Sequence, residues 1–188
     1  MLKTLAITTF IALIALSGCS DSKQKQPDES ANALIAKTQY RLVSLDGKPI
    51  TVTKEGPNFV TDGVAEPVVV YDIFATWCPP CRAEAPHLSS LQKKFAGKVK
   101  FIGISIEEGK DNAYFKRFAE EIGISYTLVN SPDNLKAARA IAGAIGLGED
   151  FPIPLMVIYQ NGVYVKHYAG LVPEEMLESD LKQLVSER

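Results

Sequence analysis

A buried strand that runs straight into a pair of cysteines constrains this chain more than any other feature. Residues 68–75 (VVVYDIFA) form an almost continuous apolar run, which is typical of a central parallel strand covered on both faces. The segment Trp-Cys-Pro-Pro-Cys follows at residues 77–81, and apolar residues then recur with helical spacing over residues 78–96. A CxxC pair placed where a strand meets a helix indicates redox chemistry.

The start of a helix favours the thiolate form of a cysteine, because free N–H groups and the positive end of the helix dipole lie there. The thiolate is the nucleophile of thiol–disulfide exchange. We therefore predict that Cys78, exposed at the helix start, attacks, and that Cys81, facing the core, resolves the mixed disulfide. Two intervening prolines remove N–H donors, so we expect Cys78 to be less acidic than the cysteine of a strong oxidant.

A zinc site and an inert structural disulfide are the alternatives for the cysteine pair. Zinc usually takes four ligands, but the chain has no second CxxC and only two histidines, His87 and His167. An inert disulfide would account for the cysteines but not for their acidic neighbours. We expect no metal and no cofactor other than a redox-active disulfide between Cys78 and Cys81.

Two carboxylates accompany the cysteines. Asp72 is the exception in the apolar run, and an unpaired buried carboxylate should have a raised pKa and could accept the proton of Cys81. The alternative is that Asp72 caps the strand end or pairs with a lysine of residues 94–100. Glu84 follows Cys81 by three residues and could also take its proton, although a plain solvent-facing glutamate is the alternative.

Three further residues have simpler expected roles. We expect Arg82 and His87 to lie on the surface of the helix. Pro154 directly precedes the apolar segment 155–159, where a proline can form a cis turn and leave backbone groups free for a substrate strand. Pro152 is the rival for this role, and an ordinary trans proline is the alternative.

The rest of the chain predicts an α/β sandwich with a mixed central sheet flanked by helices. Asp46-Gly47 supplies the turn of an N-terminal β-hairpin, and a loop is expected after it. Asp133 is a candidate helix cap. The expected strands are residues 40–45, 50–53, 99–105, 126–129, 155–159 and 163–168, and the expected further helices are residues 111–122, 132–142 and a last one from 173.

The first residues predict an export signal. As a helix, the apolar run 5–16 would span about 18 Å, well short of the ~30 Å core of a membrane, and a basic start precedes it. Residues 16–19 (LSGC) resemble a bacterial lipobox, in which Cys19 would be acylated. The alternative is an ordinary signal peptide with an incidental cysteine. We therefore predict a signal peptide over residues 1–18, a lipid-anchored tether over 19–39 and one domain over 40–188.

Composition narrows the function classes. The chain is 46% hydrophobic and 22% charged, with a net charge of −2, which is ordinary for a globular protein and lacks the basic character of a nucleic-acid binder. Its 3 cysteines are too few for a disulfide-rich scaffold.

Residues 74–86 (FATWCPPCRAEAP) resemble the signature of TlpA/ResA/CcmG-like extracytoplasmic thiol–disulfide oxidoreductases, within the thioredoxin superfamily. The resemblance covers about residues 40–188 and implies a thioredoxin-like sandwich with one inserted helix and strand at 109–130. It places Asp72 on the position of thioredoxin's buried aspartate, where many members of this subgroup carry asparagine, and Glu84 on the subgroup's active-site glutamate. It also implies that Trp77 and the cis-proline loop, Ile153 and Pro154, contact the substrate.

The same resemblance implies a monomeric, membrane-anchored reductase that faces the periplasm. Its partners would be client proteins with disulfides, apocytochrome c among them, and a membrane electron donor of the DsbD/CcdA type. Two alternatives remain open, a periplasmic disulfide oxidase or isomerase and a non-enzymatic thioredoxin-like binding module. The intact CxxC argues against the second, and exchange chemistry alone does not set the direction of electron flow.

Overall fold

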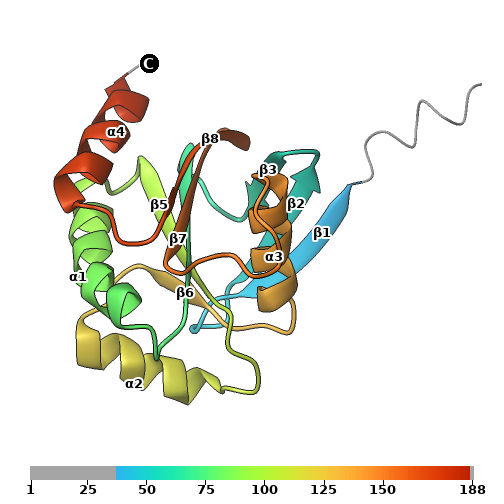
Figure 1. The fold of residues 1–188 in the computed structure, drawn as a ribbon, viewed down its shortest axis with the longest axis vertical. Helices are drawn as coiled ribbons and strands as arrows, with labels where there is room; N and C mark the ends of the chain where they lie inside the picture. The colour runs from blue at the N-terminus through green and yellow to red at the C-terminus, as the bar shows by residue number, and fades with distance from the viewer. Residues whose placement is uncertain (1–36, 187–188) are drawn as a thin grey trace, which may run out of the picture. The chain divides into compact units, whose positions relative to one another are not determined.

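The computed structural model describes residues 37–186. The predicted signal peptide, Cys19 and most of the tether therefore lie outside the described residues. The described elements, in chain order (Figure 1), are β1 (Thr38–Val43), β2 (Pro49–Glu55), β3 (Asn58–Asp62), β4 (Val68–Phe74), α1 (Pro79–Lys94), β5 (Val99–Ser105), α2 (Asn112–Ile122), β6 (Thr127–Val129), α3 (Asn134–Ala144), β7 (Leu155–Gln160), β8 (Val163–Ala169) and α4 (Glu174–Ser186).

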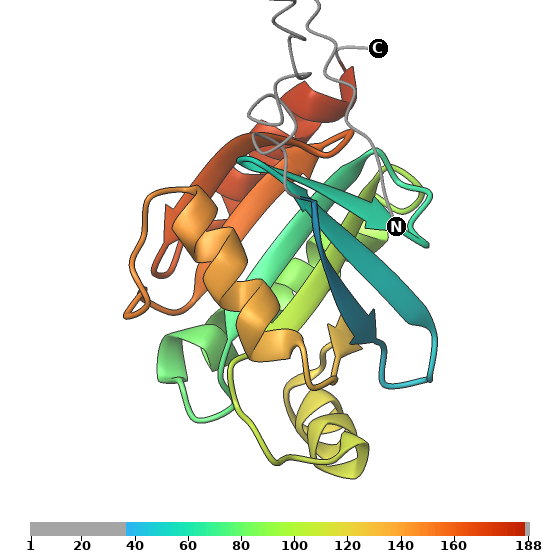
Figure 2. The same cartoon turned by 90° about the vertical axis from the view of Figure 1, so that its right-hand side faces the viewer.

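The centre of the fold is a mixed five-stranded sheet in the order β6-β5-β4-β7-β8. Strand β4 pairs in parallel with β5 and antiparallel with β7, so it occupies the middle of the sheet. Helices α1, α2 and α4 lie on one side of this sheet, and α3 lies on the other side together with the small N-terminal sheet (Figures 1 and 2). The predicted sandwich with a mixed sheet is confirmed.

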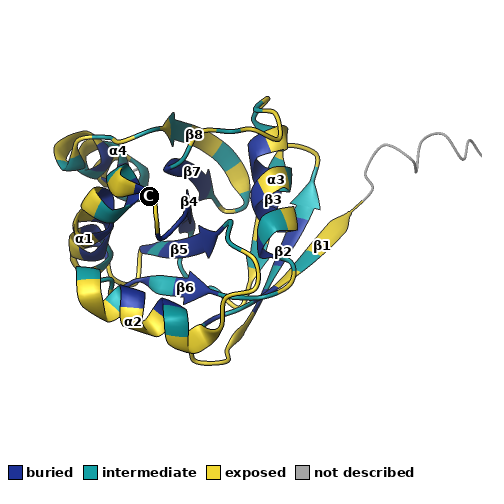
Figure 3. Cartoon of the chain, turned by 60° about the horizontal axis from the view of Figure 1, so that its bottom comes forward, coloured by how far each residue is buried: buried dark blue, intermediate teal, exposed yellow. Residues whose placement is uncertain are grey.

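Every residue of β4 is buried, and its side chains alternate between two cores. Val70 and Phe74 pack with α1, α2 and α4, whereas Tyr71 and Ile73 pack with α3 and the N-terminal sheet. The buried central strands stand out against the exposed outer faces of the helices (Figure 3). Asp72 shares the alternation of Val70 and Phe74, so the strand directs its carboxyl group toward α1.

The predicted N-terminal hairpin is part of a three-stranded antiparallel sheet, β1-β2-β3. The loop expected after this hairpin was wrong in part, because β3 lies within it. Gly56 turns the chain with a φ of 63°, and Phe59 is then fully buried in the core shared with α3. The N-terminal sheet therefore closes the face of the main sheet opposite α1.

The inserted helix and strand expected within residues 109–130 are α2 and the edge strand β6. The capping role predicted for Asp133 is wrong in its detail. Asp133 precedes α3 but makes no capping hydrogen bond, and its Oδ2 instead accepts the N–H of Arg41 at 3.0 Å, which ties α3 to β1. No helix within residues 37–186 is long and apolar enough to cross a membrane.

Candidate active site

The two cysteines of the CxxC segment are joined in a disulfide at the start of α1, with their Cα atoms 5.3 Å apart. Cys78 is the N-cap residue, and its Sγ accepts the backbone N–H of Cys81 at 3.3 Å. Pro79 and Pro80, which carry no backbone N–H, open the helix. The helix start therefore donates one backbone N–H to the sulfur of Cys78, as the sequence predicts, whereas its first two residues have no N–H to donate.

The expected difference in exposure between the cysteines is wrong. Cys78 is 3% exposed and Cys81 is 5% exposed, so both are buried in the disulfide form. Trp77, the residue directly before Cys78, is 65% exposed. The buried disulfide is therefore preceded in the chain by an exposed aromatic side chain.

The peptide bond between Ile153 and Pro154 is cis, which places the cis proline at Pro154 rather than at Pro152. The carbonyl oxygen of Ile153 lies 3.9 Å from the Sγ of Cys78. The carbonyl oxygen of Pro154 accepts the N–H of Gly170 at 2.8 Å. The proline loop is therefore held from the β8 side and lies against the sulfur.

Glu84 is buried, with 2% of its surface exposed, so the solvent-facing alternative is wrong. Its Oε1 accepts the backbone N–H of Val172 at 3.3 Å, whereas its Oε2 is buried without a hydrogen-bond partner. Burial, and next the negative charge of Asp72, raise the pKa of Glu84 to about 8. A carboxyl group with an unused oxygen therefore lies one helical turn beyond Cys81.

Asp72 is also buried, at 3% exposure, and it makes no ion pair among the described residues. The lysine pairing considered as an alternative is absent there, and Lys94 instead binds Glu178 at 2.7 Å. The one hydrogen bond to the carboxyl group of Asp72 comes from the hydroxyl of Tyr126 to Oδ2, at 2.7 Å. Burial raises the pKa of Asp72 to about 6, against the opposing effect of this hydrogen bond.

Tyr126 is the partner that the sequence analysis missed. Burial, and next the negative charge of Asp72, raise the pKa of its hydroxyl well above the ordinary value. The hydroxyl therefore stays protonated and acts as a donor. Its signal in the sequence is indirect, since a glycine inside the apolar strand 99–105 marks a place where another group comes close.

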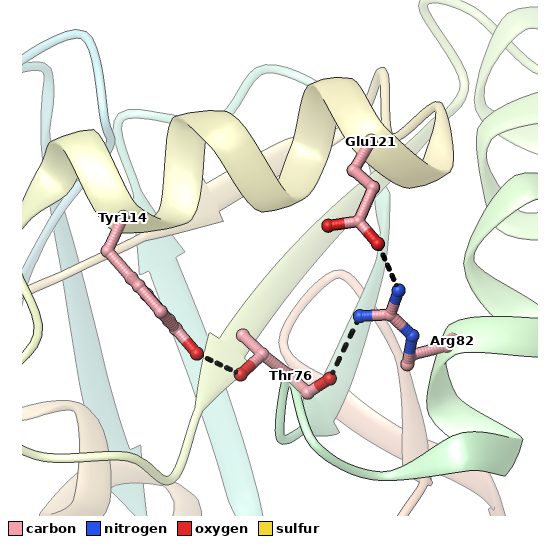
Figure 4. Close-up of polar contacts among 4 residues, drawn as sticks. All are labelled: Thr76, Arg82, Tyr114 and Glu121. Carbon is pink, nitrogen blue, oxygen red and sulfur yellow. Dashed lines mark hydrogen bonds and ion pairs between the residues drawn. The ribbon is translucent and has the colours of Figure 1, made fainter.

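Arg82 is not a simple surface residue. Its Nη1 donates to the carbonyl oxygen of Thr76 at 3.2 Å, and its Nη2 binds the carboxylate of Glu121 on α2 (Figure 4). The hydroxyl of Thr76 shares a 2.7 Å hydrogen bond with the hydroxyl of Tyr114, also on α2. These contacts fasten the loop before the cysteines to the inserted helix.

The carboxylate of Glu107 completes this attachment. It accepts the backbone N–H of Thr76 at 2.6 Å and the hydroxyl of Thr76 at 3.1 Å. His87, by contrast, lies on the exposed side of α1 as expected, with its Nδ1 2.7 Å from Glu174. Among the described residues, no group of three His, Cys, Asp or Glu side chains could hold a metal ion.

Comparison with known proteins gives one family. The family model described as Redoxin matches residues 38–185. The thiol-disulfide oxidoreductase ResA of Bacillus thuringiensis is 28% identical over 159 residues, which cover 78% of this chain and 86% of that protein. The thiol:disulfide interchange protein DsbE of Vibrio cholerae is 29% identical over 147 residues, which cover 72% of this chain and 74% of that protein.

Solved structures agree on the fold. A thiol:disulfide interchange protein of the thioredoxin family from Chlorobium tepidum has a TM-score of 0.59 at 24% identity, covering 80% of this chain and 95% of that one. A thio-disulfide isomerase from Thermus thermophilus has a TM-score of 0.56 at 22% identity, covering 78% and 92%. The fold is thus thioredoxin-like, and the chain belongs to the Redoxin family as a thiol–disulfide oxidoreductase of the type that ResA and DsbE represent.

Proposed function

We propose that this protein reduces disulfides in client proteins, with Cys78 as the attacking residue and Cys81 as the resolving one. The observation that carries the proposal is the buried carboxyl group of Glu84, whose Oε2 has no partner one turn beyond Cys81. A base whose pKa is raised to about 8 suits the deprotonation of a buried thiol. That deprotonation is the step a reductase needs when it resolves a mixed disulfide.

Two features of the site support electron flow from this protein to its client. A strong oxidant is one whose reduced form is stabilised, chiefly as a thiolate at the start of a helix. Here two of the first backbone groups of α1 belong to prolines and cannot donate. Negative charge on Asp72 or Glu84 also disfavours a further thiolate nearby. Both effects favour the disulfide and make the dithiol a better reductant.

The reaction balances as a two-electron exchange. The Cys78 thiolate attacks one sulfur of a client disulfide, and the other client sulfur leaves and takes a proton from solvent. The Cys81 thiol passes its proton to Glu84 and attacks the Sγ of Cys78, which releases the second client sulfur as a thiolate. The client gains two electrons, and the Cys78–Cys81 disulfide forms again.

A membrane dithiol protein of the DsbD/CcdA type would reduce the Cys78–Cys81 disulfide. Its first thiolate attacks Cys78, and Cys81 leaves and recovers its proton from Glu84. Its second thiol then attacks the mixed disulfide, which releases Cys78 as a thiolate and closes the donor's own disulfide. We propose that the domain works as a monomer outside the cytoplasm, held at the membrane by acylated Cys19. The lipobox resemblance of residues 16–19 supports this anchor. Replacement of Cys19 by Ser should abolish incorporation of a labelled fatty acid.

Client binding would use the surface beside the disulfide. Trp77 is exposed there, and a groove of about 300 Å³ runs from Trp77 to Arg117 and Phe118 on α2. The carbonyl oxygen of Ile153 lies 3.9 Å from the Sγ of Cys78, and a client strand would pair with the backbone of this proline loop. Apocytochrome c is the client class that we propose on the resemblance of residues 74–86.

Trapping of clients tests this proposal. Cys81→Ser leaves the nucleophile but removes the resolving thiol, so mixed disulfides with client proteins should accumulate in cells and run as larger, reductant-sensitive bands. Cys78→Ser should give none. The client proteins identified by trapping are then followed in cells that lack the protein. If the protein is a reductase, these clients should accumulate there with their disulfides intact. Their accumulation as free thiols would mean an oxidase, and a lack of trapped species would contradict exchange with proteins.

A further inference from the structure

An opening in β5 lies beside Asp72. Gly103 is the residue of β5 that pairs with Asp72 in the parallel register. A Cβ atom at position 103 would lie 2.5 Å from Cδ2 of Leu128 and 3.0 Å from Cε2 of Tyr126. The first distance is too short for any real Cβ contact, so the end of the Leu128 side chain would have to move. The second is tight, so the Tyr126 ring would have to give by a few tenths of an ångström.

The ring of Tyr126 uses this opening. Tyr126 is 7% exposed and packs in the core between the main sheet and α1, where its hydroxyl donates to Oδ2 of Asp72 at 2.7 Å. It comes from the segment that ends the α2 insertion, immediately before β6. The missing side chain of Gly103 therefore leaves room for Leu128 and for the Tyr126 ring beside the buried carboxyl group.

We propose that Tyr126 is a positioning residue whose hydroxyl holds Asp72 as a carboxylate. Glu84 is then the group that accepts the proton of Cys81 and returns it. Gly103 leaves the space that the Tyr126 ring needs for this contact. The proposal rests on the thiol–disulfide exchange described above. It deepens that function by giving the two buried carboxyl groups different tasks.

The surroundings of Asp72 leave few other charges to consider. The charge of Asp72 acts on Glu84 of α1, and from the segment before β6 its carboxyl group accepts a hydrogen bond from Tyr126. The other elements around this core present apolar side chains, which are Phe118 of α2, Met156 of β7, and Leu177 and Leu181 of α4. Within residues 37–186, the hydrogen bond from the Tyr126 hydroxyl is what favours the ionised form of Asp72.

Loss of this hydroxyl has opposite effects on the two carboxyl groups. Without the hydrogen bond, the pKa of Asp72 rises, because burial then acts alone. Asp72 is then ionised less often, so its charge raises the pKa of Glu84 less and the pKa of Glu84 falls. The two values should approach each other by about 1 pH unit.

The test is a carboxyl titration of the full-length protein in its disulfide form, followed by NMR of the side-chain carboxyl carbons. In Tyr126→Phe we expect the apparent pKa of Asp72 to rise and that of Glu84 to fall. In the pH dependence of the rate of disulfide reduction by dithiothreitol, the two apparent pKa values should also lie closer together by the same amount. The matched control is Tyr159→Phe, because Tyr159 is 1% exposed, its hydroxyl has no partner, and it packs in the other core.

Gly103→Ala should shift both pKa values in the same directions although the hydroxyl of Tyr126 is still present. If Gly103→Ala does not fold, Tyr126→Phe alone decides. The proposal is overturned if Tyr126→Phe titrates like Tyr159→Phe. The titration needs no client, so its result is independent of the trapping experiment. If the pKa values of Asp72 and Glu84 converge in Tyr126→Phe but Cys81→Ser traps no client, this proposal stands and the reductase function is rejected.

Discussion

At the scale of single residues, the carboxyl group of Glu84 links the redox site to the stability of the whole chain. Its pKa is raised from 4.5 to about 8 by burial and by Asp72. A carboxyl group raised in this way stays protonated in the folded state while the unfolded chain releases the proton. The stability that it contributes is therefore complete below about pH 4.5 and is lost as the pH rises to about 8.

We predict that Glu84→Gln removes this loss between pH 6 and pH 8. Asp72, with a pKa of about 6, completes its ionisation at the lower end of that window, so its own contribution changes less than that of Glu84. The unfolding free energy of the oxidised parent should fall by up to about 1.4 kcal/mol per pH unit. Urea unfolding at pH 6, 7 and 8 measures this.

The matched control for that experiment is Glu175→Gln, since Glu175 is exposed on α4. This control should keep the slope of the parent protein. If Glu84→Gln also keeps that slope, Glu84 does not titrate in this window, and its role as the proton acceptor of Cys81 is wrong.

We expect the exposed side chain of Trp77 to bind the client protein. Exposed aromatic side chains often dominate binding energy, and Trp77 is 65% exposed next to the disulfide. Trp77→Ala should lower kcat/KM for reduction of a protein disulfide about tenfold but leave the reaction with dithiothreitol nearly unchanged. Val163→Ala, at an exposed position of β8, is the control. Equal losses with both substrates would show that Trp77 supports the site rather than binding the client.

At the scale of elements, the loop before Cys78 depends on the insertion that follows β5. Glu107 accepts two hydrogen bonds from Thr76, at 2.6 and 3.1 Å, and hydrogen bonds to a charged group contribute about 1.5–3 kcal/mol. We predict that Glu107→Ala destabilises the protein by about 2 kcal/mol and speeds hydrogen exchange at the amide of Thr76. Glu108→Ala is the control, because Glu108 is exposed and bonds to no described residue. Unchanged exchange in Glu107→Ala would contradict this attachment.

The sequence predicts the elements that carry strong local signals and misses the contacts that depend on distant residues. The strand expected at residues 99–105, which is rich in apolar residues, matches β5 at both ends. Strand β3 was missed because glycines near both of its ends suggest a loop, while the burial of Phe59 depends on a core that forms only in the fold. The hydrogen bond from Tyr126 to Asp72 joins residues 54 positions apart, and no local sequence pattern predicts such a contact.

The same limit applies to the site residues. The helix start at Cys78 follows from local spacing and is present. The sequence left open whether Pro152 or Pro154 is the cis proline, and the cis bond precedes Pro154. The burial of Cys78 and the bridging role of Arg82 are set by neighbouring segments, the proline loop and α2. Both residues were expected to be exposed because an isolated amphipathic helix would leave them so.

At the scale of the whole molecule, the main sheet separates two tasks. The side with α1, α2 and α4 holds the disulfide, both buried carboxyl groups and Tyr126. The other side, with α3 and the N-terminal sheet, is an apolar and aromatic core around Tyr71 and Tyr159. Redox properties should therefore depend on residues of the first side, whereas the second side supplies stability.

The reduction potential of the Cys78–Cys81 pair tests the proposed reductase most directly. Full-length protein is equilibrated in glutathione or dithiothreitol buffers, and the fraction of disulfide is measured at each potential. Missing N–H donors and buried carboxyl groups disfavour the thiolate, so we predict a value near or below roughly −220 mV. A value near roughly −120 mV, typical of a strong oxidant, would contradict the account and indicate a disulfide oxidase.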